Sequence, residues 1–126
     1  MSMHRLAISI SLCLAAVGAQ AQSAAKPDLD CNSPDLGQQG MNQCAYEVFN
    51  VQDRELNKLY GRLLKQSDAE AAKQLQAAQR AWVQFRDLEC IFETPDAGGS
   101  LAPLEKASCM TALTKSRISD FKRSLR

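Results

Sequence analysis

Four cysteines carry the clearest chemical signal in this chain of 126 residues. Cys31, Cys44, Cys90 and Cys109 form an even set, which in an oxidising compartment predicts two disulfides. Their spacings are far longer than the close cysteine pairs of structural zinc sites, so the sequence indicates no metal site. The single histidine, His4, lies in an apolar leader. The rest of the chain therefore has no imidazole to activate a thiol as a nucleophile.

Glu89 and Glu93 are paired carboxylates at helical spacing and are the remaining candidates for acid–base chemistry. Hydrolysis of a sugar would also require a cleft around them and one carboxyl group held protonated. A solvated helix face explains the pair better. The lack of histidine beyond the leader removes the commonest general base and metal ligand. We therefore predict a protein that is not an enzyme and needs no cofactor.

Residues 1–21 have the pattern of a cleaved export signal. Arg5 closes a short basic segment, and an apolar run at residues 6–17 leads to the small-x-small motif Ala19-Gln20-Ala21. The run is too short to span a bilayer comfortably. Leu12 stands where a lipidation site would need a small residue before Cys13. The sequence predicts cleavage after Ala21, no membrane anchor, and export to a bacterial periplasm or the medium.

The charge of the chain is balanced once the signal is removed. The whole sequence has 15 basic and 14 acidic residues, and only Arg5 is lost with the signal. A balanced chain has no electrostatic reason to bind nucleic acid or an anionic membrane. The segment before the helices, residues 22–39, forms an N-terminal arm that carries Asp28, Asp30 and Asp35. We interpret this acidic arm and the basic C-terminal tail as solvated surface.

Apolar residues recur at intervals of three and four in three segments, which predicts three helices at about residues 40–65, 68–93 and 100–125. Ser67 and Glu70 resemble a capping box for the second helix. Ser100 is expected to cap the third, with Pro103 in its first turn. The expected inward residues are Met41, Ala45, Val48, Phe49, Leu56, Leu59, Tyr60 and Leu63; Leu75, Ala78, Trp82, Phe85 and Leu88; and Leu104, Met110, Leu113, Ile118, Phe121 and Leu125.

Short links between long helices imply antiparallel neighbours, so the predicted fold is all-α, an up-down-up bundle of three helices over residues 40–126. This topology brings Cys44, Cys90 and Cys109 to one end, where Cys31 can fold back on Cys44. The favoured disulfides are Cys31–Cys44 and Cys90–Cys109. The alternative pairs Cys44 with Cys90 and Cys31 with Cys109.

Polar residues also recur on one face of each expected helix. They are Asp53, Asn57 and Tyr60 on the first, Gln79, Trp82 and Arg86 on the second, and Thr114 and Arg117 on the third. Their structural role would be a polar network that fixes which helices face each other, with Arg86 pairing Asp53. The functional alternative is a protein-binding surface with Trp82 or Tyr60 as its aromatic anchor.

The order of several short motifs resembles the LprI-like lysozyme inhibitor family over nearly the whole chain after the signal. The motifs are Met41-Asn42-Gln43-Cys44-Ala45, Asp53-x-x-Leu56-Asn57-x-x-Tyr60, Gln79-Arg80-Ala81-Trp82-x-x-Phe85-Arg86-Asp87-x-x-Cys90, Gly98-Gly99-Ser100 and Cys109-x-x-x-Leu113-Thr114-x-x-Arg117. The resemblance implies a small, secreted, disulfide-bonded helical domain that inhibits lysozyme. The inhibitor that names the family resembles a lipoprotein, whereas this chain lacks a lipidation cysteine.

Taken with the resemblance, the sequence predicts a periplasmic or secreted binding protein that inhibits lysozyme by occluding its cleft. The alternative is a periplasmic adaptor or envelope-stress module that does not act on lysozyme. Lysozymes are commonly basic, so an acidic surface could steer association. Loops pinned by disulfides lose less entropy on binding. The candidate partner-binding residues are Asp28, Asp30, Asp35, Trp82, Asp96, Gly98, Gly99 and Ser100. The oligomeric state and the class of lysozyme are left open.

Overall fold

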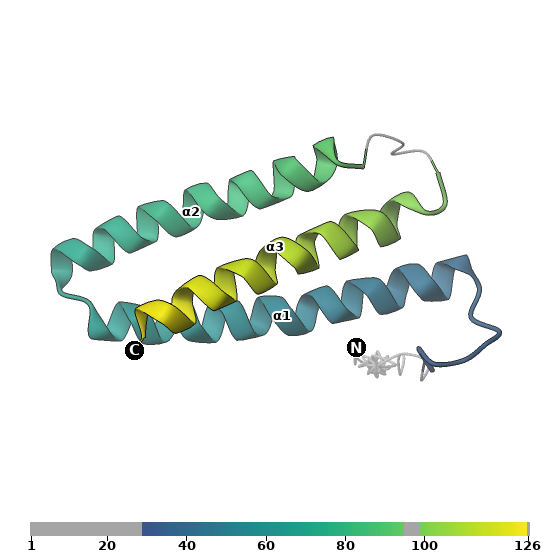
Figure 1. Ribbon diagram of the computed structural model, residues 1–126, viewed down its shortest axis with the longest axis horizontal. Helices are drawn as coiled ribbons and strands as arrows, with labels where there is room; N and C mark the ends of the chain where they lie inside the picture. Colours follow the sequence, from purple (N-terminus) through teal and green to yellow (C-terminus); the bar gives the residue numbers. More distant parts are fainter. Residues whose placement is uncertain (1–28, 95–98, 126) are drawn as a thin grey trace, which may run out of the picture.

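The computed structural model describes residues 29–94 and 99–125, and within these ranges the chain forms three helices and no strand. The helices are α1 (Gln38–Gln66), α2 (Ala69–Phe92) and α3 (Ala102–Ser124). Each helix runs antiparallel to the one before it (Figure 1). The predicted all-α fold of three helices is confirmed for the described residues. The signal segment at residues 1–21 lies outside the described residues, and the domain boundaries remain predictions.

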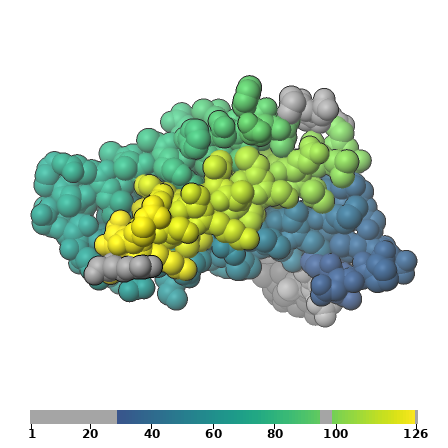
Figure 2. Space-filling view, in the orientation of Figure 1, coloured from purple at the N-terminus to yellow at the C-terminus, as the bar shows by residue number. Residues whose placement is uncertain are grey.

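The hydrophobic core lies between α1 and α3, which make by far the most extensive helix contact and touch along much of their length (Figure 2). Its buried members are Leu56, Leu59 and Leu63 from α1 and Ile118 and Phe121 from α3, flanked by Tyr60, Leu75, Trp82 and Leu125. α2 contacts α3 much less and lies along one edge of the bundle (Figure 1). α2 therefore needs other ties to hold its position.

The face that α2 turns inward agrees only in part with the expected one, since Leu75 and Trp82 do pack against the core. Phe85 and Leu88 are 50% and 59% exposed, and Ala78 is exposed as well, so these three predictions of inward residues were wrong. The buried residues of α2 are Gln79, Arg86 and Cys90. Gln79 and Arg86 have hydrogen-bond partners on the neighbouring helices, and Cys90 is bonded to α3. The side of α2 that carries these three residues therefore faces the bundle.

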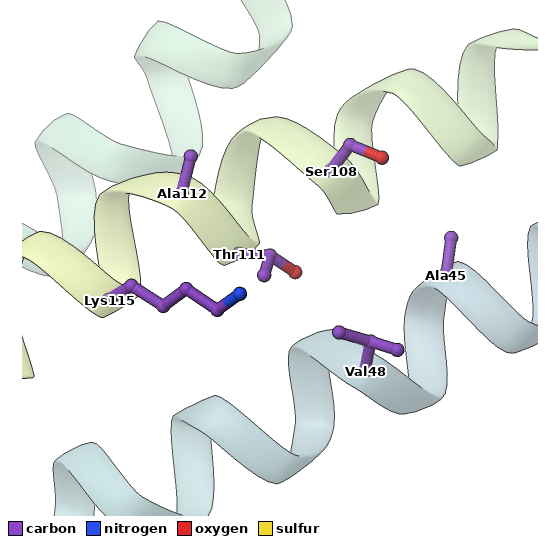
Figure 3. Close-up of a pocket in the computed structure, with 6 residues that line it drawn as sticks. All are labelled: Ala45, Val48, Ser108, Thr111, Ala112 and Lys115. Carbon is purple, nitrogen blue, oxygen red and sulfur yellow. The ribbon is translucent and has the colours of Figure 1, made fainter.

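Two expected core residues of α1 are also exposed. Met41 is 37% exposed and Val48 is 50% exposed. Val48 borders a shallow hollow between α1 and α3, together with Ala45, Ser108 and Thr111, rather than entering the core (Figure 3). The apolar residues of α1 form a stripe that includes both the side facing the core and part of the adjacent surface. Periodicity alone could not tell which of these residues are buried.

Two predictions of helix-capping residues were wrong. Asp68, not Ser67, caps α2, because its carboxylate accepts a hydrogen bond from the Ala71 amide at 2.8 Å. α1 extends to Gln66, and the Ser67 hydroxyl donates to the Leu63 carbonyl instead. Ser100 does not cap α3, whose N-cap position is Leu101 and has no side-chain cap bond. Proline does lie in the first turn of α3, as expected.

Replacing Asp68 with alanine should lower the free energy of unfolding by about 1 kcal/mol, because the amide of Ala71 loses its acceptor. Thermal unfolding followed by circular dichroism would show a fall in Tm of roughly 5 °C. Ser67→Ala is the matched control, since it alters the neighbouring residue and leaves this cap intact. A larger loss for Ser67→Ala than for Asp68→Ala would contradict the assignment of the cap.

The two disulfides are Cys31–Cys44 and Cys90–Cys109, with Cα–Cα distances of 5.7 and 5.6 Å. The favoured pairing is thus confirmed and the alternative is excluded. The first bond ties the arm to α1, where Leu36 lies over Gly40. A Cβ at position 40 would come within 2.5 Å of Leu36 Cδ1, so the glycine permits this close approach. The second bond ties the end of α2 to the start of α3.

Candidate functional site

Both disulfides lie at one end of the bundle, which we call the disulfide end (Figure 1). It comprises residues 29–37 of the arm, the first turns of α1, the last turns of α2 and the first turns of α3. The Asn42 side-chain amide donates to the Ser100 carbonyl at 2.9 Å, and Gln38 donates to Asn42 Oδ1 at 2.8 Å. These bonds fasten the start of α1 to the connection between α2 and α3. The arm and that connection are therefore held at the same end.

The disulfide end carries a hollow of about 460 Å³ where the three helices meet. Its lining residues are Tyr46, Asp87, Ile91, Pro103, Lys106, Ala107 and Met110. A neighbouring hollow of about 340 Å³ shares Ile91, Pro103 and Lys106. Tyr46 and Ile91 are 52% and 54% exposed. Because Cys90 precedes Ile91 and Cys109 precedes Met110, the disulfide holds two walls of the hollow in place.

Charge is unevenly distributed along the bundle. Among the described residues, the disulfide end has seven acidic side chains and two basic ones. The acidic residues are Asp30, Asp35, Glu47, Asp87, Glu89, Glu93 and Glu105, and the basic residues are Lys106 and Arg86, which is paired with Asp87. The opposite half is basic, and its cations are Arg54, Lys58, Arg62, Lys65, Lys73, Arg80, Lys115, Arg117, Lys122 and Arg123. The neutral net charge of the described chain therefore conceals a strong separation of charge. Such a separation orients an approaching charged protein.

Arg86 is the centre of a polar network in the middle of the bundle. Its side chain is 7% exposed, and its Nη1 donates to Asp53 Oδ1 at 2.9 Å and to Thr114 Oγ1 at 3.4 Å. Nε donates to Asp87 Oδ1 at 3.0 Å. The guanidinium carbon lies 5.1 Å from the Phe49 ring centroid. Arg86 thus contacts all three helices, and the expected pairing with Asp53 is present.

Trp82 links this network to a second arginine. Its ring lies 5.3 Å from the guanidinium carbon of Arg86 and 5.8 Å from that of Arg117. Arg117 Nε donates to Gln79 Oε1 at 3.3 Å, and its guanidinium lies 4.7 Å from the Phe121 ring centroid. Cation–π contacts of this kind add to the packing of α2 on α3. The half-buried indole of Trp82 is therefore engaged within the bundle.

The remaining network residues lie beside these two arginines. Asn57 donates to Asp53 Oδ2 at 3.0 Å, which leaves both carboxylate oxygens of Asp53 hydrogen-bonded. Tyr60 stacks on Phe121 with 6.3 Å between ring centroids. Thr114 is completely buried. The structure brings these polar residues together as a network between helices, and their contribution to partner binding remains a prediction.

The predicted partner-binding residues fall in two places. The residues exposed at the disulfide end are Asp30, Asp35, Gly99 and Ser100, whereas Trp82 lies near the middle of α2. Asp28, Asp96 and Gly98 lie outside the described residues. Sequence reasoning missed Tyr46, Ile91 and Lys106, which line the hollow. These residues could have been found from their closeness in sequence to Cys44, Cys90 and Cys109. The predicted topology brings these cysteines to one end of the bundle, and it brings the neighbouring residues there as well.

The described residues contain no group of three or more side chains that could hold a metal ion. Among the helices of this part of the chain, none is long and apolar enough to cross a membrane. What the disulfide end offers is a rigid, acidic surface with exposed apolar side chains. These features suit contact with another protein.

Comparison with known sequences places the chain in a family. The family model described as lysozyme inhibitor LprI matches residues 30–121. The chain belongs to the LprI lysozyme inhibitor family. The match begins just before Cys31 and ends at Phe121, so both disulfides and the whole polar network of this LprI domain lie inside it. The family resemblance expected from the motifs is confirmed.

Two relatives of this chain are uncharacterized proteins. One, from Rhizobium meliloti, is 32% identical over 92% of this chain and 90% of its own length. The other, the uncharacterized protein YecT of Escherichia coli, is 30% identical over 61% of this chain and 57% of its own length. No solved structure matches the chain.

Proposed function

We propose that this LprI family protein inhibits lysozyme outside the cytoplasm, most simply in the periplasm, by placing its disulfide end over the sugar-binding cleft of the enzyme. The observation that carries the proposal is the acidic surface at that end, with Tyr46 and Ile91 exposed within it. Family membership supplies lysozyme as the partner.

Electrostatic attraction would act first. Lysozymes are commonly basic, so the acidic disulfide end would face the enzyme while the basic half of the bundle points away. Complementary charge raises the rate of association more than the final affinity, and salt screens it. This orientation would bring the arm, the hollow and the start of α3 toward the enzyme together.

Apolar contact would then provide affinity. Exposed aromatic and aliphatic side chains at the centre of an interface contribute most of its binding energy when water is excluded around them. Tyr46 and Ile91 line one hollow, together with one acidic and one basic side chain, Asp87 and Lys106. The two disulfides hold these surfaces before binding, so little ordering entropy is lost on association.

The test is a turbidity assay of lysozyme on bacterial cell walls, with oxidised protein that starts at Gln22. We expect inhibition that weakens as salt is added. Ile91→Arg should abolish most of it, because it replaces an exposed apolar side chain of the hollow with a cation that would face a basic enzyme. Val51→Arg is the matched control, since Val51 is 52% exposed on α1 and lies outside the hollow.

Loss of inhibition in both variants would contradict the placement of the site at the hollow. Absence of inhibition by the unaltered oxidised protein at large molar excess would contradict the function itself. The adaptor role would then be the better interpretation of the same acidic surface.

A further inference from the structure

The outward face of α2 carries a second regular pattern. Ala78, Ala81, Phe85, Leu88 and Phe92 follow one another at intervals of three, four, three and four residues. This alternation is the apolar seam of a coiled coil, which repeats every 3.5 residues on average. We call these five residues the outer seam.

The outer seam points away from the rest of the bundle. Phe85, Leu88 and Phe92 are 50%, 59% and 75% exposed, and both alanines are exposed. The buried residues Gln79, Arg86 and Cys90 occupy the other side of the same helix. α2 lies along an edge of the bundle, so its outer side faces solvent over its length (Figure 1). The inward side of α2 thus mixes the polar residues Gln79 and Arg86 with apolar ones, while three large apolar side chains face outward, which is unusual for a surface helix.

We propose that a second copy of this chain covers the outer seam, with the two α2 helices antiparallel and Phe85 near the two-fold axis. In that register Ala78 faces Phe92 of the other copy, and Ala81 faces Leu88. Leu88 and Phe92 each meet a small side chain, and the two Phe85 rings meet each other at the axis, so the two seams interdigitate. A two-fold interface must be self-complementary, and the sequence of the outer seam meets this condition.

The charges of the bundle favour the same antiparallel arrangement. The disulfide end is acidic and the opposite half is basic, as described above. Antiparallel pairing would place the acidic end of each copy beside the basic half of the other. A parallel pair would place acidic beside acidic and basic beside basic. Complementary charge thus selects the orientation, while the apolar seam supplies the contact area.

The outer seam includes Leu88 and Phe92 of the last turns of α2, so the dimer would cover that side of each disulfide end. The arm and Tyr46 of α1 lie outside the seam. The dimer does not depend on the proposed function, and either could fail without the other. Formation of the dimer requires only the outer seam of α2 and the charge separation along the bundle.

Sedimentation equilibrium of the oxidised protein that starts at Gln22, across micromolar to millimolar concentrations, tests the proposal. We expect a reversible dimer. Leu88→Glu should raise its dissociation constant by about 100-fold, because the substitution removes a buried leucine from each copy. Val51→Glu is the control, since Val51 is comparably exposed on α1 and lies outside the seam. Circular dichroism would establish that both variants stay folded.

Isotope-filtered nuclear Overhauser spectra of mixed labelled and unlabelled protein test the register. We expect contacts between the Ala78 methyl and the Phe92 ring of different copies. Within one helix these residues are separated by 14 positions, or about 21 Å, so an intramolecular contact cannot produce the signal. A monomer at all concentrations would overturn the proposal, as would a dimer that Leu88→Glu leaves intact. Leu88→Glu reducing lysozyme inhibition in a protein that is monomeric throughout would assign the seam to the enzyme instead.

Discussion

Replacing Arg86 with alanine should lower the free energy of unfolding by about 3 kcal/mol, one of the two largest effects expected for this protein. The arginine is almost completely buried and contacts Asp53, Thr114 and the Phe49 ring. Truncation would remove the side chain that joins α2 to both other helices. Asp53 is 34% exposed and keeps its bond from Asn57, so water can partly solvate it and the loss stays at the lower end for a buried pair.

Chemical denaturation of Arg86→Ala would measure this loss as a lower midpoint of unfolding. Asp53→Asn and the double variant complete a double-mutant cycle, which isolates the coupling between the two side chains. Arg80→Ala is the matched control, because Arg80 is exposed on the same helix and its removal should change stability by less than about 0.5 kcal/mol. An Arg86→Ala midpoint equal to that of Arg80→Ala would refute the structural role of the network.

The second large effect concerns the Cys90–Cys109 bond. Removing it by Cys90→Ser with Cys109→Ser should lower the free energy of unfolding by about 3 kcal/mol, because the unfolded chain gains loop entropy. The bond closes a loop with a sequence separation of 19 residues. Its loss should also have a local effect, because α2 has few other contacts with the bundle. We expect faster amide hydrogen exchange in the last turns of α2, measured by mass spectrometry on the native protein.

Cys31→Ser with Cys44→Ser is the matched control for that experiment. Its loop has a sequence separation of 13 residues, so the loss of stability by loop entropy should be similar. The difference lies in location, since this bond holds the arm and not α2. Equal exchange in α2 for the two double variants would show that the Cys90–Cys109 bond does not hold the end of this helix.

Sequence periodicity placed the first two helices well because their apolar residues recur at helical intervals over many turns. The first two expected segments, about 40–65 and 68–93, agree with α1 and α2 to within two residues. The disulfide pairing followed from the antiparallel order, since opposite helix directions bring Cys90 and Cys109 together. The N-cap was missed by one position, because Ser67 and Asp68 are both good capping residues and only the end of α1 decides between them.

The orientation of α2 could not be read from hydrophobicity. Its apolar residues Phe85 and Leu88 favour one face, while Gln79, Arg86 and Cys90 occupy another, and both sets have helical spacing. The bundle buries the second set because each of its members has a specific partner elsewhere in the chain. Partners distant in sequence leave no trace in the local periodicity. Two clues were available: the disulfide of Cys90, which requires that side of the helix to face α3, and the helical spacing of the polar residues Gln79 and Arg86.

The way α2 is attached gives the protein a dependence on its redox surroundings. One end of α2 continues directly into α1 through Ser67 and Asp68, and the other is bonded covalently to α3. Between these points Arg86 provides the principal polar contact. In a reducing compartment the helix would be hinged at one end only. The last turns of α2, which contribute to the proposed binding surface, would then be fixed in place only after the cysteines are oxidised.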